Sequence, residues 1–326
     1  MPRMKILIAG GTGFLGSHIV DALLEQGPKD ELAVLTRNPG RSLKWGTKVR
    51  AVGGDVTEPE CLDHATRGFD CIVHCVQFPN HPIENAWKGY TYQRVDGQGT
   101  VDLVAAAKRN GVKRFVYLSG AGASPEKPQP WFRAKAMAEK AVRESGIPHV
   151  ILRPSWVYGP GDRSLSRFIA WTRGLLPPFV PVIGDGRNKV QLISVFDVAQ
   201  AAAKSVTKDE AAGKTLELGG PEALTMDEIL LTIRRVLGGG RPLLHHPVIA
   251  MKFTALLAEI AFEAATALAV VASAGALKGL FAPTPFLTRP AIDFILMEEP
   301  VDPKPAEALF GMSFARFEDG LKRYVR

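Results

Sequence analysis

The chain has 326 residues, of which 46% are hydrophobic and 22% are charged, and its formal net charge is +7. These values are ordinary for a globular, enzyme-like protein that is long enough for a full domain and a smaller second unit. No run rich in Lys and Arg is interleaved with aromatic residues, which excludes a typical nucleic-acid partner. The excess of positive charge suits acidic ligands such as phosphates, or an anionic membrane surface, although a basic protein without such partners fits equally well.

Three cysteines, Cys61, Cys71 and Cys75, indicate a reducing compartment. Cys71 and Cys75 lie four residues apart on an expected strand, about 13 Å from each other, too far for a disulfide. The first expected strand begins at Lys5, which leaves no room for a signal peptide. The uncharged stretch 264–277 is shorter than the ~18 residues that cross a bilayer. We therefore expect a cytoplasmic protein, with peripheral membrane association as an open alternative.

The first motif of the chain, KILIAGGTGFLG, joins a short apolar strand to three glycines spaced three residues apart and then to a helix. Such glycines let the backbone turn sharply, let a ligand approach closely, and let the helix pack on the strand. The unpaired N–H groups at the start of the helix favour an anion, usually a dinucleotide pyrophosphate. The alternative is a tight turn that binds nothing. We expect the cofactor to contact Gly10, Thr12, Gly13, Phe14, Leu15 and Gly16.

Strand and helix patterns alternate through the first half of the chain, which predicts a parallel sheet with helices on both faces. In this half, strands are expected at 5–9, 32–36, 49–52, 71–76, 115–119 and 150–153, and helices at 14–26, 100–110 and 132–145. Beyond Pro154 the expected elements are a strand and helix within 190–206, a strand at 216–218, a helix at 226–237, a helical region at 247–281 and a short helix within 309–325.

The predicted fold class is α/β, a Rossmann-type doubly wound parallel sheet with a smaller, partly discontinuous C-terminal domain. We predict an NAD(P)-binding domain at 1–159 plus 190–206. A smaller substrate or lid domain is predicted at 160–189 plus 207–326.

The end of the second strand bears on the choice of nicotinamide cofactor. A carboxylate there accepts from the ribose 2′-hydroxyl of NAD, whereas an arginine accommodates the 2′-phosphate of NADP. This strand ends at Arg37, which can stack on adenine and grip phosphate, and Arg41 and Lys44 follow. We predict NADPH in preference to NAD; the alternative is that Arg37 is a solvated loop charge. Asp55 and Val56, after the third strand, are expected to meet the adenine ring.

These features resemble the extended and atypical short-chain dehydrogenase/reductases. Within that superfamily the resemblance is to the NAD-dependent epimerase/dehydratase-like group related to the 39 kDa accessory subunit of respiratory complex I. It covers nearly the whole chain. The segments that carry it are LSGAGAS (118–124), WFRAKAMAEKAV (131–142), LRPSWVYGPGD (152–162), PVIGDGRNKVQLISVFDVAQA (181–201), TLELGGPEALTMDEIL (215–230) and VDPKPAEALFG (301–311).

In active members of this superfamily a Tyr and a Lys lie four apart on one helix, so that the Lys holds the cofactor ribose and lowers the tyrosine pKa. Lys135 matches the lysine and is implied in cofactor binding and catalysis. Trp131 stands at the tyrosine position; its indole N–H donates a hydrogen bond but cannot transfer a proton at neutral pH. Ser119 matches the catalytic serine, although it could equally cap a turn. Tyr158 is a further candidate acid/base, or a residue that lines the pocket.

Two departures from the family pattern weaken any transfer of epimerase chemistry. The pattern Asn-Val-x-Gly-Thr is replaced by DGQGT, so Asp96 stands where an asparagine orders the active site. The pattern His-Val-x-Asp-Val-Ala is replaced by SVFDVA, which begins at Ser194 and keeps Asp197 as an expected helix cap. Pro154, at the end of the sixth strand, completes the expected cofactor site.

Three functions stay open on the sequence. The chain is an NAD(P)H-binding accessory or regulatory protein without turnover, or a reductase that lacks the usual tyrosine and acts on a small molecule that the sequence does not identify. The third, a sugar-nucleotide epimerase or dehydratase, needs a strong base where Trp131 stands. His81, His245 and His246 show no metal-ligand spacing, so no metal is expected.

The region 247–281 has a broad apolar face and is flanked by Lys252 and Lys278. It fits a lid over the substrate cleft, an oligomer contact or a membrane-contacting segment, also within a larger complex. We favour the lid.

Overall fold

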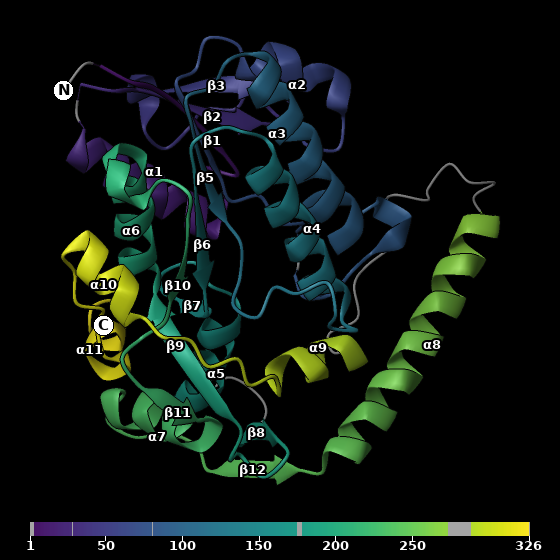
Figure 1. Cartoon of the computed structure of the whole chain (residues 1–326). Coiled ribbons are helices and arrows are strands. Elements are labelled where there is room, and N and C mark those ends of the chain that lie inside the picture. Colours follow the sequence, from purple (N-terminus) through teal and green to yellow (C-terminus); the bar gives the residue numbers. More distant parts are fainter. Residues whose placement is uncertain (1–2, 28, 80, 175–177, 273–287, 326) are drawn as a thin grey trace.

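The main body of the protein is built on a seven-stranded parallel sheet with the order β3-β2-β1-β4-β5-β6-β10. The computed structural model describes residues 3–27, 29–79, 81–174, 178–272 and 288–325 (Figure 1). The strands of this sheet are β1 (Lys5–Ala9), β2 (Glu31–Thr36), β3 (Val49–Gly53), β4 (Cys71–His74), β5 (Arg114–Leu118), β6 (His149–Pro154) and β10 (Lys214–Leu218). The order reverses between β1 and β4, so a crevice opens at the carboxyl ends of these two strands. The predicted Rossmann-type fold is confirmed.

Helices cover both faces of this sheet, and for that reason its strands are continuous apolar runs. One face carries α1 (Phe14–Gln26), α6 (Val195–Thr207) and α10 (Lys304–Phe310), and the other carries α2 (Pro59–Thr66), α3 (Gly99–Arg109) and α4 (Pro130–Glu144) (Figure 1). Along β1, Ile6 and Ile8 enter the first core while Leu7 and Ala9 enter the second. Each strand therefore joins two hydrophobic cores.

Several short elements differ from the sequence prediction. Helix α2 was not expected; it is eight residues long and buries only Leu62, Ala65 and Thr66, too short a pattern to stand out. A π-helical turn, η3 (Tyr92–Gln98), leads directly into α3. The short helix expected within 309–325 is present as α11 (Phe317–Lys322), and a further short helix, α10, precedes it. Single-turn helices are η1 (Gly46–Lys48), η2 (Ala86–Lys88) and η4 (Asp209–Ala211).

A second layer of smaller sheets lies below the main sheet (Figure 1). One sheet consists of β7 (Trp156–Tyr158), β9 (Lys189–Ser194) and β11 (Ala223–Thr225), and the other pairs β8 (Val180–Ile183) with β12 (Leu243–His246). Helices α5 (Ser164–Arg173), α7 (Met226–Val236) and α11 pack with them around a third core. Thr225 caps α7 in a reciprocal pair with Glu228. The division into two domains stays a prediction, since the chain passes between the layers where β9 joins α6.

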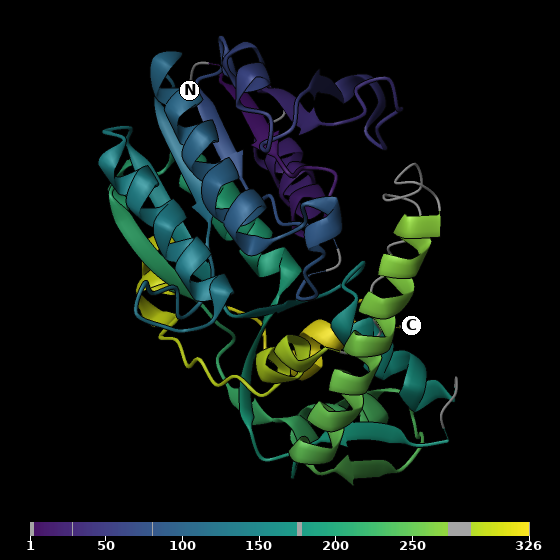
Figure 2. The same ribbon diagram turned by 90° about the vertical axis from the view of Figure 1, so that its right-hand side faces the viewer.

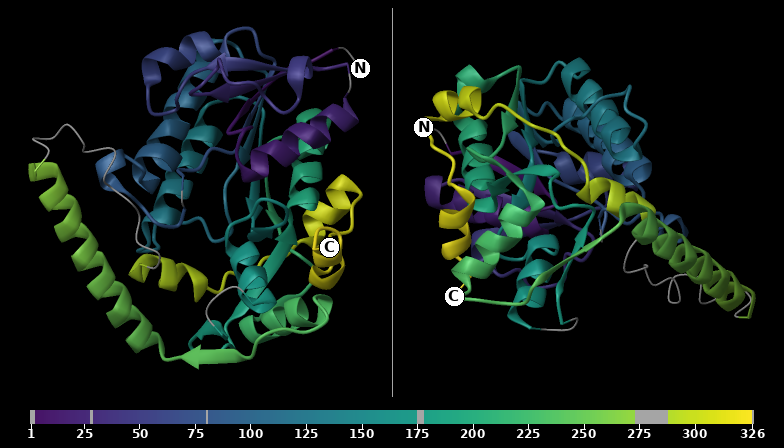
Figure 3. Two further views of the ribbon diagram at one scale, coloured as in Figure 1. Left: turned by 180° about the vertical axis from the view of Figure 1, so that it is seen from behind. Right: turned by 90° about the horizontal axis from the view of Figure 1, so that it is seen from below.

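The C-terminal half also contains a long helix, α8 (Val248–Ala272), and a short one, α9 (Arg289–Ile295). Figure 2 shows α8 along one side of the molecule, and Figure 3 shows it extending away from the other elements. The predicted helical region thus begins as expected, and the part of 247–281 after 272 lies outside the described residues. Within the described chain, none of the helices combines the length and the apolar character needed to cross a membrane.

The contact between Gly16 and Gly10 gives a test of this fold. A Cβ atom on Gly16 would overlap the carbonyl carbon and oxygen of Gly10, which are backbone atoms with no freedom to move aside. We expect Gly16→Ala to lower the free energy of unfolding by about 2 kcal/mol, measured by urea denaturation. Gly40→Ala is the control, because no atom lies within 4 Å of its Cβ position. Equal stability of the two variants would contradict the packing described.

Candidate functional site

The glycine turn between β1 and α1 lies at the carboxyl edge, against the end of β4. Gly10 has a φ of +91°, and a Cβ on it would lie 2.9 Å from the backbone of Cys75. The amide of Gly13 donates to the carbonyl oxygen of Gly10 at 2.9 Å, which closes the turn. No described side chain caps α1, and its first turn contains no acidic residue. The helix N-terminus therefore keeps N–H groups available for an anion.

The other predicted loop residues occupy three different environments. Thr12 is exposed, the ring of Phe14 lies edge-on to His18 with 6.0 Å between ring centroids, and Leu15 packs against the first core. Leu15 can therefore contribute only its backbone to a ligand. Pro154 ends β6, and its carbonyl oxygen accepts from the amide of Ala121 at 2.9 Å.

Arg37 and Asp55 come together at the ends of β2 and β3. Their side chains form a loose ion pair, 4.0 Å from Nε to Oδ2, in which Arg37 is half-exposed. Asp55 also accepts from the amide and the hydroxyl of Thr57, both at 2.9 Å, so its carboxylate is fixed. Val56 is buried against Gly99 at the start of α3. Lys44 is held elsewhere, on Asp21 at 2.8 Å.

Lys135 is buried inside the protein rather than extended over an open cleft. Its Nζ lies 3.1 Å from Oδ1 of Asp96, a carboxylate that is itself fully buried, and 5.5 Å from the centre of the Tyr117 ring. Burial alone would lower the pKa of Lys135, but Tyr117 and Asp96 outweigh it and raise that pKa. Lys135 therefore stays protonated and is neutralised by Asp96.

The groups around this ion pair are buried and uncharged. Burial raises the pKa of Tyr117 to about 12. Burial and the charge of Lys135 together lower the pKa of His74 to about 3. The His74 ring stacks on Tyr117, and its Nε2 lies 2.8 Å from Oγ1 of Thr100. Tyr117 and His74 thus form a polar cluster with Lys135 that the sequence analysis did not identify.

Trp131 lies one helical turn before Lys135, among aromatic side chains. Its ring lies edge-on to Phe294 at 5.8 Å and to His81 at 6.5 Å between centroids. It also covers Gly120 so closely that a Cβ there would overlap the indole. The indole N–H is buried and donates to no group among the described residues. Burial and Lys135 lower the pKa of His81 to about 3, so this cluster carries no charge at neutral pH.

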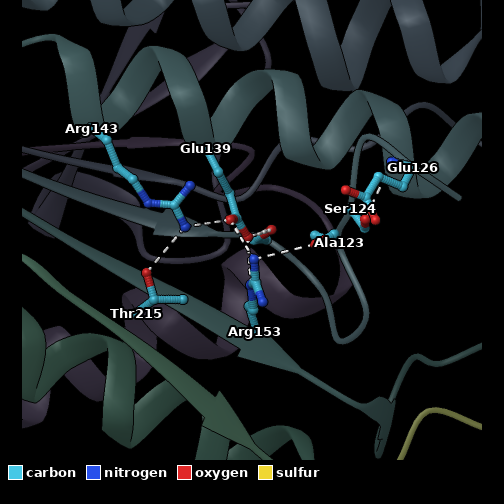
Figure 4. A network of polar contacts seen from close by, with 8 residues as sticks. Ala123, Ser124, Glu126, Glu139, Arg143, Arg153 and Thr215 are labelled. Atoms are coloured by element: carbon cyan, nitrogen blue, oxygen red, sulfur yellow. Dashed lines mark hydrogen bonds and ion pairs between the residues drawn. The ribbon is translucent and has the colours of Figure 1, made fainter.

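The hydroxyl of Ser119 is engaged in a different network, which Figure 4 shows around Glu139. Ser119 donates to Oε1 of Glu139 at 2.6 Å. Arg153 donates to both carboxylate oxygens, each at 2.7 Å, and Arg143 donates to Oε2 at 2.6 Å. The catalytic role of Ser119 stays a prediction. In this structure its hydroxyl donates to the Glu139 carboxylate and so helps to hold α4 on the sheet.

Tyr158 packs in the third core rather than with Lys135. It is fully buried, its hydroxyl donates to the carbonyl oxygen of Phe317 at 3.5 Å, and burial raises its pKa. The expectation that Asp197 caps α6 is wrong: the Ser194 hydroxyl caps this helix, and Asp197 accepts from the amide of Ala315 at 2.9 Å. A free acid/base role for Tyr158 has no support in these contacts.

A glycine turn at the switch point of a doubly wound sheet, with an uncapped helix behind it, defines a dinucleotide-binding fold. The NAD dependent epimerase/dehydratase family model matches residues 6–219, and the chain belongs to this family. It is 32% identical to a 2-alkyl-3-oxoalkanoate reductase of Stenotrophomonas maltophilia over 270 residues, 73% of this chain and 77% of that protein.

A second relative and two solved structures extend the comparison. Subunit 9 of the NADH dehydrogenase [ubiquinone] 1 alpha subcomplex of Arabidopsis thaliana is 30% identical over 68% of this chain and 55% of that protein. The Citrobacter triphenylmethane reductase, solved with NADP(H), superposes with a TM-score of 0.68 at 22% identity and covers 98% of this chain and 100% of that chain. MoeE5, solved with UDP-glucuronic acid and NAD, superposes with a TM-score of 0.69 at 21% identity and covers 98% of this chain and 97% of that chain. These two likenesses show the fold.

The Glu139 network predicts a pH-dependent loss of stability. Burial alone would raise the pKa of Glu139, but hydrogen bonds from Arg153, Ser119 and Arg143 outweigh it and hold that pKa below its usual range. The carboxylate therefore stabilises the folded state above the unfolded pKa, and this stabilisation is lost as the pH falls through the lower folded pKa. At pH 7 we expect Glu139→Gln to cost about 3 kcal/mol by urea denaturation, a difference that shrinks below about pH 4.

The matched control is Glu144→Gln on the same helix, whose exposed carboxylate lies 3.8 Å from Lys140. Surface pairs of this kind contribute little, so this variant should unfold like the parent protein at every pH. A pH-independent effect of Glu139→Gln would contradict the assignment.

Proposed function

We propose that this protein binds NADPH at the carboxyl edge and reduces an apolar acceptor that needs no proton from the protein. The observation that carries the proposal is Trp131, which stands one turn before Lys135 with a buried N–H that can donate a hydrogen bond but cannot give up its proton near neutral pH. When bound, the nicotinamide supplies hydride. The protein has only to hold the two reactants and exclude water.

The residues of the carboxyl edge fit a nicotinamide dinucleotide. Side chains at Gly10 and Gly16 would fill the space of the turn, and the N-terminus of α1 stays open to a pyrophosphate. Arg37 is the cation at the end of β2, and its loose, half-exposed pair with Asp55 leaves guanidinium donors for a 2′-phosphate. This favours NADPH over NADH.

The acceptor is expected to have a mostly apolar surface and to become uncharged on receiving hydride, so that no proton has to be added. A groove of about 840 Å³ runs between α8, α9 and residues 82–87. Apolar residues such as Ile83, Leu256 and Phe262 make up half of its lining, and the other half is polar or charged. Pro82 and Asp293 also line it, and their chain neighbours His81 and Phe294 contact Trp131. A flat conjugated cation, whose charge is cancelled by the added hydride, suits this neutral aromatic surrounding. Relatives include the 2-alkyl-3-oxoalkanoate reductase and an NAD(P)H azoreductase of Xenophilus azovorans.

A second candidate function, an accessory protein that binds the cofactor without turnover, is favoured by one contact. The Lys135 ammonium is already paired with Asp96 inside the protein, and one turn before it stands Trp131 rather than a phenol that it could activate. Relatives with such names include the photosystem II assembly factor Ycf39 of Synechocystis. The free thiols of Cys61, Cys71 and Cys75 support a reducing, cytoplasmic setting, and association with a larger complex would accompany this function.

Cofactor choice is tested by titrating NADPH and NADH into the protein and following nucleotide fluorescence. We expect NADPH to bind more tightly than NADH. Arg37→Ala should lower the affinity for NADPH by about tenfold or more, because a charge-assisted hydrogen bond to phosphate is lost, and should change the affinity for NADH little. Arg50→Ala is the control, since its guanidinium lies over the ring of Phe69. Tighter NADH binding, or an unchanged NADPH affinity in Arg37→Ala, would refute the choice of NADPH.

Turnover is tested with two kinds of acceptor in NADPH oxidation assays. A triarylmethyl cation becomes neutral on receiving hydride, so the parent protein should reduce it without a solvent isotope effect. A simple ketone needs a proton as well, and we expect its reduction to be faster in Trp131→Tyr, which introduces a phenol. NADPH binding without oxidation by either acceptor would support the accessory function instead.

A further inference from the structure

Helix α8 turns an apolar face away from the protein. Among the described residues, half of the large hydrophobic side chains that are markedly exposed lie on this helix: Ile249 at 83%, Phe253 at 61%, Leu257 at 53% and Ile260 at 57%. Their spacing of four, four and three residues puts them on one side of an α-helix. The single polar group among them, the hydroxyl of Thr254, donates to the carbonyl oxygen of Ala250 at 3.0 Å.

The charged side chains of the same helix are all used on the opposite side. Lys252 forms an ion pair with Asp293 at 2.6 Å, and Glu259 forms one with Arg289 at 2.8 Å. Glu263 accepts from the indole of Trp87 at 3.3 Å. The inward side of α8 combines these contacts with the buried Ala255 and the half-buried Met251 and Leu256, while a second apolar stripe faces away from the body. If α8 were a lid, the role favoured from the sequence, only the side of the helix that lines the groove would contact the substrate. The outer face would still be exposed to solvent.

Two observations indicate what covers this outer face. The sequence from 264 to 277 contains no charged residue, so the apolar character of the chain continues beyond these four side chains, and an apolar surface of this extent needs an apolar surrounding. A second copy of the helix would cover one stripe, and four side chains from each copy bury about 1,000 Å², less than the ~1,200–2,000 Å² of a stable interface. A lipid surface can cover all of these side chains at once, whatever the area they expose.

We propose that α8 lies in the interface of a lipid bilayer and inserts Ile249, Phe253, Leu257 and Ile260 among the acyl chains. The helix lies in the membrane plane, with its charged side attached to the protein body. The net charge of +7 favours a surface that contains anionic lipid. This inference goes beyond the proposed function, because it concerns a surface that does not include the cofactor site.

Flotation of the full chain with vesicles tests it. The vesicles contain phosphatidylcholine and phosphatidylglycerol, and the parent protein is expected to float with them. Phe253→Asp combined with Leu257→Asp should reduce the bound fraction by more than about tenfold, because carboxylates resist transfer into acyl chains. Leu231→Asp is the matched control: this leucine is 45% exposed on α7, and the variant should float like the parent protein.

Circular dichroism melts verify that all three proteins are folded, independently of any cofactor. A second measurement uses Phe253→Trp, whose fluorescence should be quenched by brominated acyl chains, with Leu231→Trp as the unquenched control. Failure of the parent protein to float would overturn the proposal. So would self-association without lipid, seen by analytical ultracentrifugation and lost in the double variant, because the face would then join two copies of the chain.

Discussion

The turn after β1 leaves no room for a side chain, and much of the site depends on this constraint. Gly10 touches the backbone at the end of β4, and Gly16 touches Gly10, so strand, turn and helix are packed at van der Waals distance. This packing aims the uncapped start of α1 at the crevice where the strand order reverses. Because β2 runs parallel to β1, its end, with Arg37, lies at the same edge. The backbone geometry alone therefore accounts for a dinucleotide site, and side chains determine only which dinucleotide is preferred.

The second feature of the site is that its ionisable groups are already satisfied. Lys135 is neutralised by Asp96, and Ser119 donates to Glu139, which also holds two arginines. What lies next to Lys135 is an uncharged aromatic cluster around Trp131. Binding and positioning are therefore available in this protein, whereas proton transfer from the usual position is not. That separation distinguishes the chain from the sugar-nucleotide chemistry of part of its family.

The sequence predicted the main sheet well because strand runs buried on both faces are apolar throughout and glycines mark their ends. It also identified Trp131 and Lys135, since a spacing of four on a helix is a local property. It could not predict that Tyr117 and His74 share a buried cluster with Lys135, because these contacts join β4, β5 and α4 across the fold. Likewise, Ser119 meets Glu139 only through tertiary packing. The orientation of α8 could not be predicted for a related reason. Its sequence shows an apolar stripe, but it does not show which side of the helix packs against the rest of the protein.

A crystal structure of the protein with NADPH tests the central claim most directly. The account predicts the pyrophosphate against the first turn of α1 and the glycines of the turn, the 2′-phosphate against Arg37, and Lys135 still paired with Asp96. A nucleotide bound away from this turn would contradict it, as would a bound nucleotide with no contact between Arg37 and the 2′-phosphate.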